Sequence, residues 1–519
     1  MTVKVAQNGQ EKKNLLQLLR ESGQYIDAPC GGRGTCGRCR VRLLSGAAEP
    51  MPREREIFSE RELAKGWRLA CLCVPEESCE VFVPKSAQTS MAVETEFYGE
   101  TGDKGHAPEA LARYHSGAPR RRARRGIAVD IGTTTLAAAL IDPDTGETLR
   151  TVSAVNRQRA YGADVISRIR AAEDGETEAL RQSILCDIKA LATELCGSHP
   201  AETAVIAGNT VMCHLLLGYS CAGLGRAPFT PVDISLKRMT WKELFGEDGP
   251  VSTVTVLPGI SAFIGGDITA GIYSLSDLPE KGILLDIGTN GEMVLAAGDR
   301  YLAASVAAGP AFEGGNISCG VPGVPGAVSG AVLYGKERMV TKTIGGQPPV
   351  GLCGTGIIDV VYELIRHRLI DEQGTLKEPW FSSGFPVVKD KIVFTQEDIR
   401  QVQLAKAAIR AGLLLLTGAG GISLSEVTKV YVAGGFGFHL NLEKAIGIGL
   451  LPAEWKGKIT AVGNSALAGA KKYLTESAEK GEEAAAQKLC AIAERTETLN
   501  LALSPEFEEA YCAYLPFPG

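Results

Sequence analysis

Two short stretches of this chain, 156 positions apart, carry almost the same pattern. Residues 126–133 read GIAVDIGT and residues 282–289 read GILLDIGT, so six of the eight positions are identical. Each copy is an apolar run that ends in an acidic residue, followed by a glycine, a hydroxyl side chain and a second apolar run. The pattern predicts strand, turn and strand twice over. A repeat at this separation predicts two related lobes and constrains the fold of most of the chain.

The two predicted turns suit the binding of phosphate groups. Glycine lets the backbone approach a ligand closely, while backbone N–H groups and Thr or Asn side chains donate hydrogen bonds to phosphate oxygens. Asp130 and Asp286, at the ends of the preceding strands, are predicted to organise Mg²⁺ or its waters as catalytic carboxylates. The predicted nucleotide ligands in the turns are Gly132, Thr133, Thr134, Gly288, Thr289 and Asn290. Two such turns facing each other would enclose a triphosphate from both sides.

Further glycine-containing turns follow apolar runs in the same part of the chain. They are Gly208-Asn209, Gly434-Gly435 and Gly463-Asn464. Each one alone is typical of an ordinary strand-to-helix turn, and it is their joint order that favours a nucleotide site. The chain has no GxxxxGK[ST] run and no GxGxxG run between a strand and a helix, which excludes a P-loop and a dinucleotide-binding fingerprint.

Two acidic residues outside the repeat are further candidates. Asp267 follows Gly265-Gly266 and is predicted either to act on the metal or the attacking water, or to cap a helix. Residues 307–330 are so rich in Gly and Pro that we expect a loop near the phosphates, with Glu313 and Asn316 as polar contacts.

Near the N-terminus, three cysteines lie in a glycine-rich run, CGGRGTCGRC, that covers residues 30–39. Five residues separate Cys30 from Cys36, two separate Cys36 from Cys39, and Cys71 follows much later in the string RLAC. The glycines allow the positive φ values with which a tight loop turns backbone N–H groups toward sulfur. Four thiolates in this order predict a 2Fe-2S cluster. The spacing resembles that of adrenodoxin-like ferredoxins and departs from the plant-type run, which has four residues in the first gap.

Two alternatives stay open for this cysteine site. CxxC spacing is also typical of zinc, although a zinc ribbon carries two such pairs and here the fourth cysteine arrives singly. Cys73 lies two residues beyond Cys71 in an apolar, strand-like stretch where both side chains would point to one face, so Cys73 is an alternative fourth ligand. Cys79 is expected to be a small buried apolar residue.

Composition and charge exclude several classes of function. A net charge of −6 argues against a general nucleic-acid binder. The longest apolar run, at residues 411–416, is too short to span a membrane, and the first residues do not read as a signal peptide. Fourteen cysteines without a secretory signal indicate a reducing compartment. We therefore expect a cytoplasmic protein with no nucleic-acid or membrane partner.

The predicted fold is α+β and α/β multidomain. Residues 1–86 are expected to form a β-grasp ferredoxin-type domain and residues 87–125 a linker, which ends in the basic string RRRARR and serves as a tether or docks on an acidic partner. Residues 126–279 are expected to form a middle domain, the first ribonuclease H-like lobe. Residues 280–519 are expected to form the C-terminal ATPase domain, the second lobe.

The order of the glycine turns resembles the superfamily of acetate and sugar kinases, Hsc70-type chaperones and actin. In that superfamily the turn that Gly434-Gly435 resembles lies against adenosine. Over nearly its whole length the chain resembles the reductive activators of corrinoid-dependent proteins. The resemblance implies ATP-dependent electron transfer through the 2Fe-2S cluster to Co(II) of a corrinoid protein, restoring Co(I) in a methyltransferase system. It also implies an upstream low-potential electron donor, and a homodimer is expected from the resemblance alone.

Two other functions remain open from the sequence. One is a small-molecule kinase regulated by its redox domain, which would need a general base beside an acceptor pocket. The other is a redox sensor that binds nucleotide without turning it over.

Overall fold

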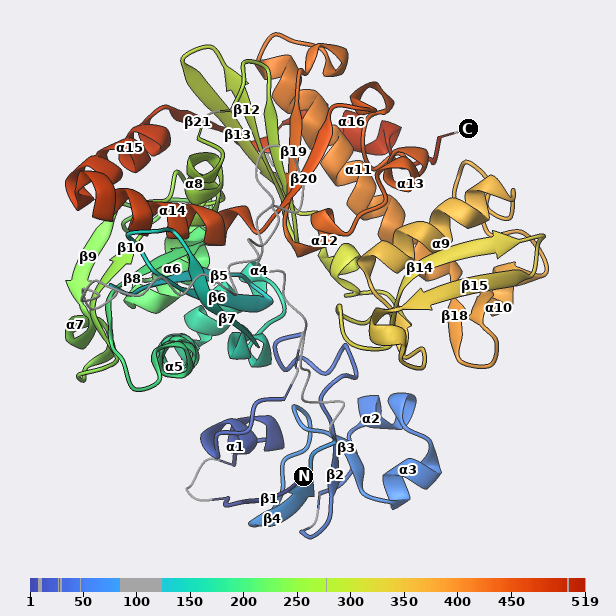
Figure 1. Ribbon diagram of the computed structural model, residues 1–519. Helices are drawn as coiled ribbons and strands as arrows, with labels where there is room; N and C mark the ends of the chain where they lie inside the picture. The colour runs from blue at the N-terminus through green and yellow to red at the C-terminus, as the bar shows by residue number, and fades with distance from the viewer. Residues whose placement is uncertain are drawn as a thin grey trace, which may run out of the picture.

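The computed structural model describes residues 1–7, 12–26, 28, 30–46, 48–84, 124–276, 278–501 and 504–518. A small N-terminal domain lies below a larger body made of two lobes (Figure 1). The predicted linker, residues 87–125, lies outside the described residues except for its last two positions.

The N-terminal domain is a four-stranded antiparallel sheet in the order β1-β4-β2-β3, flanked by helices. Its elements are β1 (Thr2–Val5), α1 (Leu15–Glu21), β2 (Arg40–Leu43), α2 (Pro52–Ile57), α3 (Glu60–Ala64), β3 (Trp67–Leu69) and β4 (Cys79–Phe82). Helix α1 begins at a capping box formed by Asn14 and Gln17. Its four leucines are buried against the sheet. This small core carries the long cysteine loop between α1 and β2.

The first lobe is built on a six-stranded sheet in the order β7-β6-β5-β8-β10-β9. Its strands are β5 (Gly126–Ile131), β6 (Thr135–Ile141), β7 (Thr148–Val155), β8 (Ala201–Gly208), β9 (Lys237–Thr240) and β10 (Val251–Val256). Its helices are η2 (Arg157–Ala160), α4 (Val165–Ala171), η3 (Ala172–Glu176), α5 (Thr177–Cys196), α6 (Thr210–Leu217), η4 (Ala222–Leu224), α7 (Trp241–Phe245) and α8 (Gly266–Ser274). Residues of α5, α6 and α7 share a core with one face of the sheet.

The second lobe repeats five strands of this plan in the sheet order β20-β19-β11-β12-β13-β21, whereas its sixth strand, β21, lies at the opposite edge from β9. Its strands are β11 (Ile283–Ile287), β12 (Gly291–Ala297), β13 (Arg300–Val306), β19 (Val430–Ala433), β20 (Ile459–Gly463) and β21 (Thr496–Leu499). The pairs β5–β6 and β11–β12 are both antiparallel hairpins. The first strand of each hairpin also pairs in parallel with a later strand, β5 with β8 and β11 with β19. The predicted strand, turn and strand of both repeats is therefore confirmed.

A further layer of the second lobe follows β13. It comprises η5 (Pro310–Glu313), β14 (Ala327–Tyr334), β15 (Arg338–Thr343), η6 (Ile344–Gly346), β16 (Gly351–Leu352), α9 (Gly354–Arg366), α10 (Trp380–Ser383), β17 (Phe385–Val388), β18 (Ile392–Phe394), α11 (Gln396–Ala419), η7 (Leu424–Glu426), α12 (Gly435–Phe438), α13 (Leu442–Gly447), η8 (Ala453–Trp455) and α16 (Pro505–Ala513). The expected loop at 307–330 is irregular apart from η5 and the start of β14.

Helix α11 is, among the residues described, the one helix long and apolar enough to cross a membrane. Two-thirds of its apolar window is buried, and the helix packs on β12, β13 and α16. Its apolar side chains therefore belong to the main core of the second lobe.

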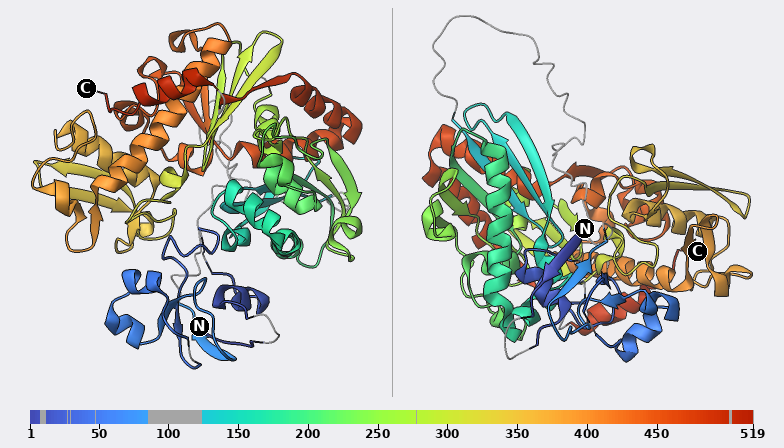
Figure 2. Two further views of the ribbon diagram at one scale, coloured as in Figure 1. Left: turned by 180° about the vertical axis from the view of Figure 1, so that it is seen from behind. Right: turned by 90° about the horizontal axis from the view of Figure 1, so that it is seen from below.

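Two late helices cross from the second lobe to the first. After β20, the chain forms α14 (Ser465–Lys480) and α15 (Glu482–Glu494), which lie over the first lobe, before β21 returns to the second sheet (Figures 1 and 2). Helix α14 packs on α8, β5 and β8. A Cβ at Gly469 would lie 2.1 Å from the carbonyl oxygen of Ala270, so the two helices touch backbone to backbone. Residues from both sheets and both helices share one core between the lobes.

Candidate functional site

The first glycine turn joins β5 to β6 and is held by hydrogen bonds from other residues of the first lobe. A Cβ at Gly132 would lie 2.7 Å from the carbonyl oxygen of Thr135, so only glycine fits without a shift. The side-chain amide of Asn156 donates to the carbonyl of Gly132 at 2.9 Å. Asn209, which caps α6, donates to the Thr133 hydroxyl at 3.0 Å. The two expected turns, at Thr133 and at Asn209, are thus in direct contact.

The second glycine turn joins β11 to β12, and a third turn approaches it closely. Gly434 has a φ of 87°, in the left-handed region, and a Cβ there would lie 2.8 Å from Asp286 Oδ1. The turn between β19 and α12 can approach the end of β11 because residue 434 is glycine. This contact places the Gly434-Gly435 turn beside the carboxylate of Asp286.

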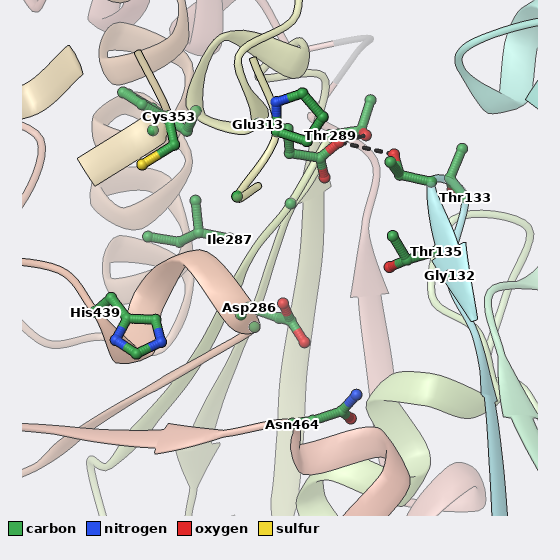
Figure 3. A pocket seen from close by; sticks show the side chains of 18 of the residues that line it. Gly132, Thr133, Thr135, Asp286, Ile287, Thr289, Glu313, Cys353, His439 and Asn464 are labelled. Atoms are coloured by element: carbon green, nitrogen blue, oxygen red, sulfur yellow. Dashed lines mark hydrogen bonds between the residues drawn. The ribbon is translucent and has the colours of Figure 1, made fainter. Parts of the chain in front are cut away.

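The carboxylate of Glu313 connects the two glycine turns. Its Oε2 accepts hydrogen bonds from the hydroxyl of Thr134 in the first lobe, at 2.8 Å, and of Thr289 in the second, at 3.1 Å. Glu313 closes the 3-10 turn η5, where Pro310 starts the turn and Gly314 ends it in the left-handed region. Figure 3 shows Glu313 between the two turns, with Asp286 and Asn464 deeper in the cavity. The sequence-predicted polar contact of Glu313 is therefore a bridge between the lobes.

A cavity of about 670 Å³ lies between the lobes and collects nearly all the predicted nucleotide residues. They are Asp130, Gly132, Thr133, Thr134, Asn209, Asp267, Asp286, Gly288, Thr289, Asn290, Gly434, Gly435 and Asn464. Gly208 is not part of the lining. It ends β8 as a buried residue, and a Cβ there would lie 3.1 Å from Ile131, so its role is to pack β8 against β5. Asn316, the other predicted contact in the 307–330 loop, is also absent from the lining.

The cavity gathers carboxylates whose pKa values are raised, chiefly by burial. Burial raises the pKa of Asp130 to about 7 although Asn464 donates to it at 2.8 Å, and burial raises that of Asp267 to about 6. Burial, then the charges of Asp267, Asp130 and Glu313, raise the pKa of Asp286 to about 7. Asp267 lies in the first turn of α8 and accepts from the N–H of Ile268 at 2.9 Å, whereas the N-cap position belongs to Gly265. The site therefore favours cations.

Several residues that line this cavity were not anticipated from the sequence, Glu292, Cys353, Thr355 and His439 among them. Glu292 lies opposite Asp286 in the β11–β12 register, and burial followed by the charges of Asp267 and Asp286 raises its pKa well above its usual range. A single acid inside the otherwise apolar strand of residues 291–297 was the available signal. Cys353 and Thr355 lie at the N-terminus of α9, and His439 follows α12. Their positions depend on how the layer that follows β13 packs against the rest of the second lobe, and no local sequence motif predicts that packing.

The four predicted cluster cysteines meet as two pairs at the other functional site. Cys36 Sγ lies 3.3 Å from Cys30 Sγ, and Cys39 Sγ lies 3.4 Å from Cys71 Sγ. The hydrogen bond from Cys36 lowers the pKa of Cys30 to about 4, whereas the hydrogen bond with Cys39, followed by burial, raises the pKa of Cys71. All 14 cysteines of the chain are free thiols. Among the residues described, no group of three or more His, Cys, Asp or Glu converges on the position of one metal ion.

The expectation that Cys71 and Cys73 lie on one strand face is wrong. β3 ends at Leu69, and the N–H of Cys73 donates to the carbonyl of Leu69 at 3.0 Å, which closes a turn through Cys71. The turn directs Cys71 to Cys39, while Cys73 is buried near Glu54, Arg68 and Cys79. The expected burial of Cys79 is confirmed.

The cysteine loop has the backbone geometry of a cluster-binding loop. Gly31, Gly32, Gly34 and Gly37 all have φ values between 64° and 86°, a region that side chains disfavour. A Cβ at Gly34 would lie 2.9 Å from the side chain of Leu72, next to Cys71. The residues present therefore fit a 2Fe-2S cluster.

Comparisons with known proteins agree with both sites. Residues 3–76 match the 2Fe-2S iron-sulfur cluster binding domain, residues 125–278 the RACo middle region, and residues 280–519 the C-terminal domain of RACo, the ASKHA domain. Corrinoid activation enzyme RamQ of Eubacterium limosum is 34% identical over 421 residues, which cover 74% of this chain and 69% of RamQ. The [Co(II) methylated amine-specific corrinoid protein] reductase of Methanosarcina barkeri is 28% identical over 384 residues, 68% and 70% of the two chains.

A solved structure extends this likeness to the whole fold. The reductive activator for corrinoid, iron-sulfur protein superposes with a TM-score of 0.68 at 28% identity, over 99% of this chain and 96% of that one. The chain belongs to the family of reductive activators of corrinoid proteins. The predicted fold class and family are thereby confirmed.

The raised pKa of Asp286 predicts a pH-dependent stability effect. The folded pKa of about 7 lies above the ordinary value of 3.8, so the folded state holds a proton that the unfolded chain has lost. Stability from this group falls as pH rises from about 4 to about 7. Asp286→Asn removes the charge, so the nucleotide-free variant should gain about 2 kcal/mol on the parent between pH 5.5 and pH 8. Thermal unfolding of the parent and of Asp286→Asn at both pH values measures the difference in their stability. A difference that does not change with pH contradicts the raised pKa of Asp286.

Proposed function

We propose that this protein is an ATP-dependent reductive activator that passes an electron to the Co(II) form of a corrinoid protein and restores Co(I). The observation that carries the proposal is the presence in one chain of two sites: paired thiols on a glycine loop and a two-lobed cavity with opposed phosphate turns. Neither site alone accounts for membership of this family. The first supplies one-electron chemistry and the second supplies a nucleotide-dependent change of state.

The thiol pairs indicate how this chain would hold a 2Fe-2S cluster, which when bound supplies a one-electron carrier. Two thiolates on one tetrahedral metal with bonds of ~2.3 Å lie about 3.7 Å apart. The pairs Cys30–Cys36 and Cys39–Cys71 are close to that separation. We therefore assign one iron to each pair. The environment of Cys73 supports Cys71 as the fourth ligand.

The cavity residues take complementary roles toward a magnesium nucleotide. Thr133, Thr134, Thr289 and Asn290 donate to phosphate oxygens, and the Gly434-Gly435 turn faces the nucleoside. Asp130, Asp267 and Asp286 hold Mg²⁺ through its waters, because Mg²⁺ dehydrates reluctantly and is held by a few carboxylates and substrate phosphates. An incoming phosphate competes with Glu313 for the hydroxyls of Thr134 and Thr289. Nucleotide binding therefore acts on the hydrogen bonds that link the two phosphate turns across the cavity.

The energy available from such a switch matches the redox task. Moving a two-state element from 1:99 to 99:1 takes about 5.5 kcal/mol of differential binding. For a one-electron couple that corresponds to ~240 mV. Coupling nucleotide binding to the corrinoid complex can therefore shift an otherwise unfavourable reduction of Co(II). The proposed setting is the cytoplasm, with a low-potential donor upstream and a homodimer as the assembly.

Replacing single cysteines tests the ligand assignment. Cys71→Ser should abolish most of the visible absorption of the reconstituted cluster, because it breaks the Cys39–Cys71 pair. Cys73→Ser, a matched change two residues away in a separate buried environment, should keep that absorption. Anaerobic reconstitution followed by visible and EPR spectra distinguishes them. Loss of the cluster in Cys73→Ser and its retention in Cys71→Ser would reverse the assignment.

An anaerobic assay tests the function itself. The reduced protein is mixed with a Co(II) corrinoid protein with and without Mg–ATP, and the Co(I) spectrum is followed. Asp286→Ala should lower ATP-dependent Co(I) formation at least 100-fold while leaving the cluster spectrum intact, because it removes a carboxylate that faces the metal. Asp299→Ala, an exposed change in the turn between β12 and β13 of the same sheet, is the control. Equal activity of the two variants argues against a nucleotide role for Asp286.

A further inference from the structure

One segment of the first lobe holds the first phosphate turn by its backbone. The N–H of Asn156 donates to the carbonyl of Thr134 at 3.0 Å, and its side-chain amide donates to the carbonyl of Gly132 at 2.9 Å. The guanidinium of Arg168, on α4, donates to the carbonyl of Thr133. Three consecutive carbonyls of the turn are thus held by residues 156–168.

Arg168 is the most demanding part of this arrangement. Its side chain is completely buried, and its described hydrogen-bond partners are uncharged: the carbonyls of Thr133 and Gly162 (3.0 Å), the Gln158 side chain (3.3 Å) and the sulfur of Met212 (3.1 Å). A buried cation without a carboxylate in contact is costly, because its charge has left water for neutral acceptors alone. What the guanidinium contributes is a fixed geometry between the phosphate turn and the residues around Gly162.

The same segment touches the N-terminal domain on its outer side. Arg20, in α1, donates to the carbonyl of Ala160, and its guanidinium lies 4.0 Å from the ring centre of Tyr161. A second cation–π contact runs the other way, with Arg157 lying 5.5 Å from the ring centre of Tyr25. Figure 1 shows the loop after α1 reaching up to the first lobe beside α4.

The contact includes the cysteine loop. A Cβ at Gly31, next to Cys30, would lie 3.0 Å from the carbonyl oxygen of Tyr161, so the loop backbone lies directly against the first lobe. The phosphate turn and the cysteine loop are therefore separated by one short, hydrogen-bonded segment.

We propose that residues 157–162 form the docking surface for this chain's own 2Fe-2S domain, and that Arg168 and Asn156 are positioning residues that make docking depend on nucleotide. The inference rests on the proposed nucleotide site. The N–H groups of Thr133 and Thr134 belong to the same peptide units as the carbonyls of Gly132 and Thr133. A phosphate on those N–H groups polarises the peptide units and strengthens their carbonyls as acceptors. Nucleotide thereby tightens residues 156–162 and favours the docked domain.

Reciprocity gives this coupling a measurable form. If nucleotide favours docking, docking must tighten nucleotide binding by the same factor. Arg20→Ala weakens docking from the N-terminal domain without touching the cavity. Mg²⁺ with a non-hydrolysable ATP analogue, AMPPNP, should bind the cluster-loaded Arg20→Ala chain at least fivefold more weakly than the parent, by isothermal titration calorimetry. Arg42→Ala, at an exposed arginine of β2 whose side chain donates to the carbonyl of Lys65 in its own domain, should bind like the parent.

The role of the positioning residues is tested in a second background. In Arg168→Met, or in Asn156→Ala, which removes no charge, adding Arg20→Ala should no longer weaken AMPPNP binding. Hydrogen exchange adds an independent measurement: AMPPNP should slow exchange in α1 of the parent and not of either variant.

The outcomes separate the two proposals. Equal AMPPNP affinity of the parent, Arg20→Ala and Arg42→Ala overturns the coupling while leaving the nucleotide site in place. An unchanged Arg20→Ala effect in both backgrounds overturns the roles of Arg168 and Asn156. Failure of the parent to bind AMPPNP overturns the proposed nucleotide site itself.

Discussion

The hydrogen bonds from Thr134 and Thr289 to the single carboxylate of Glu313 are the interaction that links the two phosphate turns across the cavity, next to the apolar core that joins the lobes. Each hydroxyl comes from a turn that follows a strand with an aspartate next to its last residue, and both aspartates line the same cavity. The same hydroxyls are the groups a phosphate would need. In the proposed function a phosphate group therefore replaces the glutamate as the acceptor of these hydrogen bonds and links the two turns in its place.

The surplus of acid in the cavity is the physical reason for including Mg²⁺ in the proposed nucleotide site. Asp130, Asp267, Asp286 and Glu292 all have raised pKa values, chiefly because burial disfavours their charged forms. A bare triphosphate would add negative charge to a cavity that already resists it. A magnesium ion bound to the triphosphate would instead attract these carboxylates, since such an ion is often the largest local charge in a site.

Much of this was accessible from the sequence because local chemistry demanded it. The two DIGT turns and the glycine loop at Cys30 each need particular residues at fixed spacing, and both predicted architectures were confirmed. The features that the sequence did not predict depend on tertiary packing. The turn at Cys71 depends on where β3 ends, and the lining at Thr355 depends on how a distant layer folds back. Gly208 has the sequence pattern of a ligand-binding turn, but in the structure it packs against Ile131 instead of lining the cavity.

The crossing of α14 and α15 onto the first lobe has a consequence for how the chain is made. The N-terminal domain has all its strands once residue 82 has been synthesised. The first lobe, by contrast, begins at Gly126 and lacks the helix that covers β5 and β8 until Lys480 has left the ribosome. Its inner apolar face must wait through the synthesis of the entire second sheet except β21. During translation the N-terminal domain can therefore fold long before the two-lobed domain is complete.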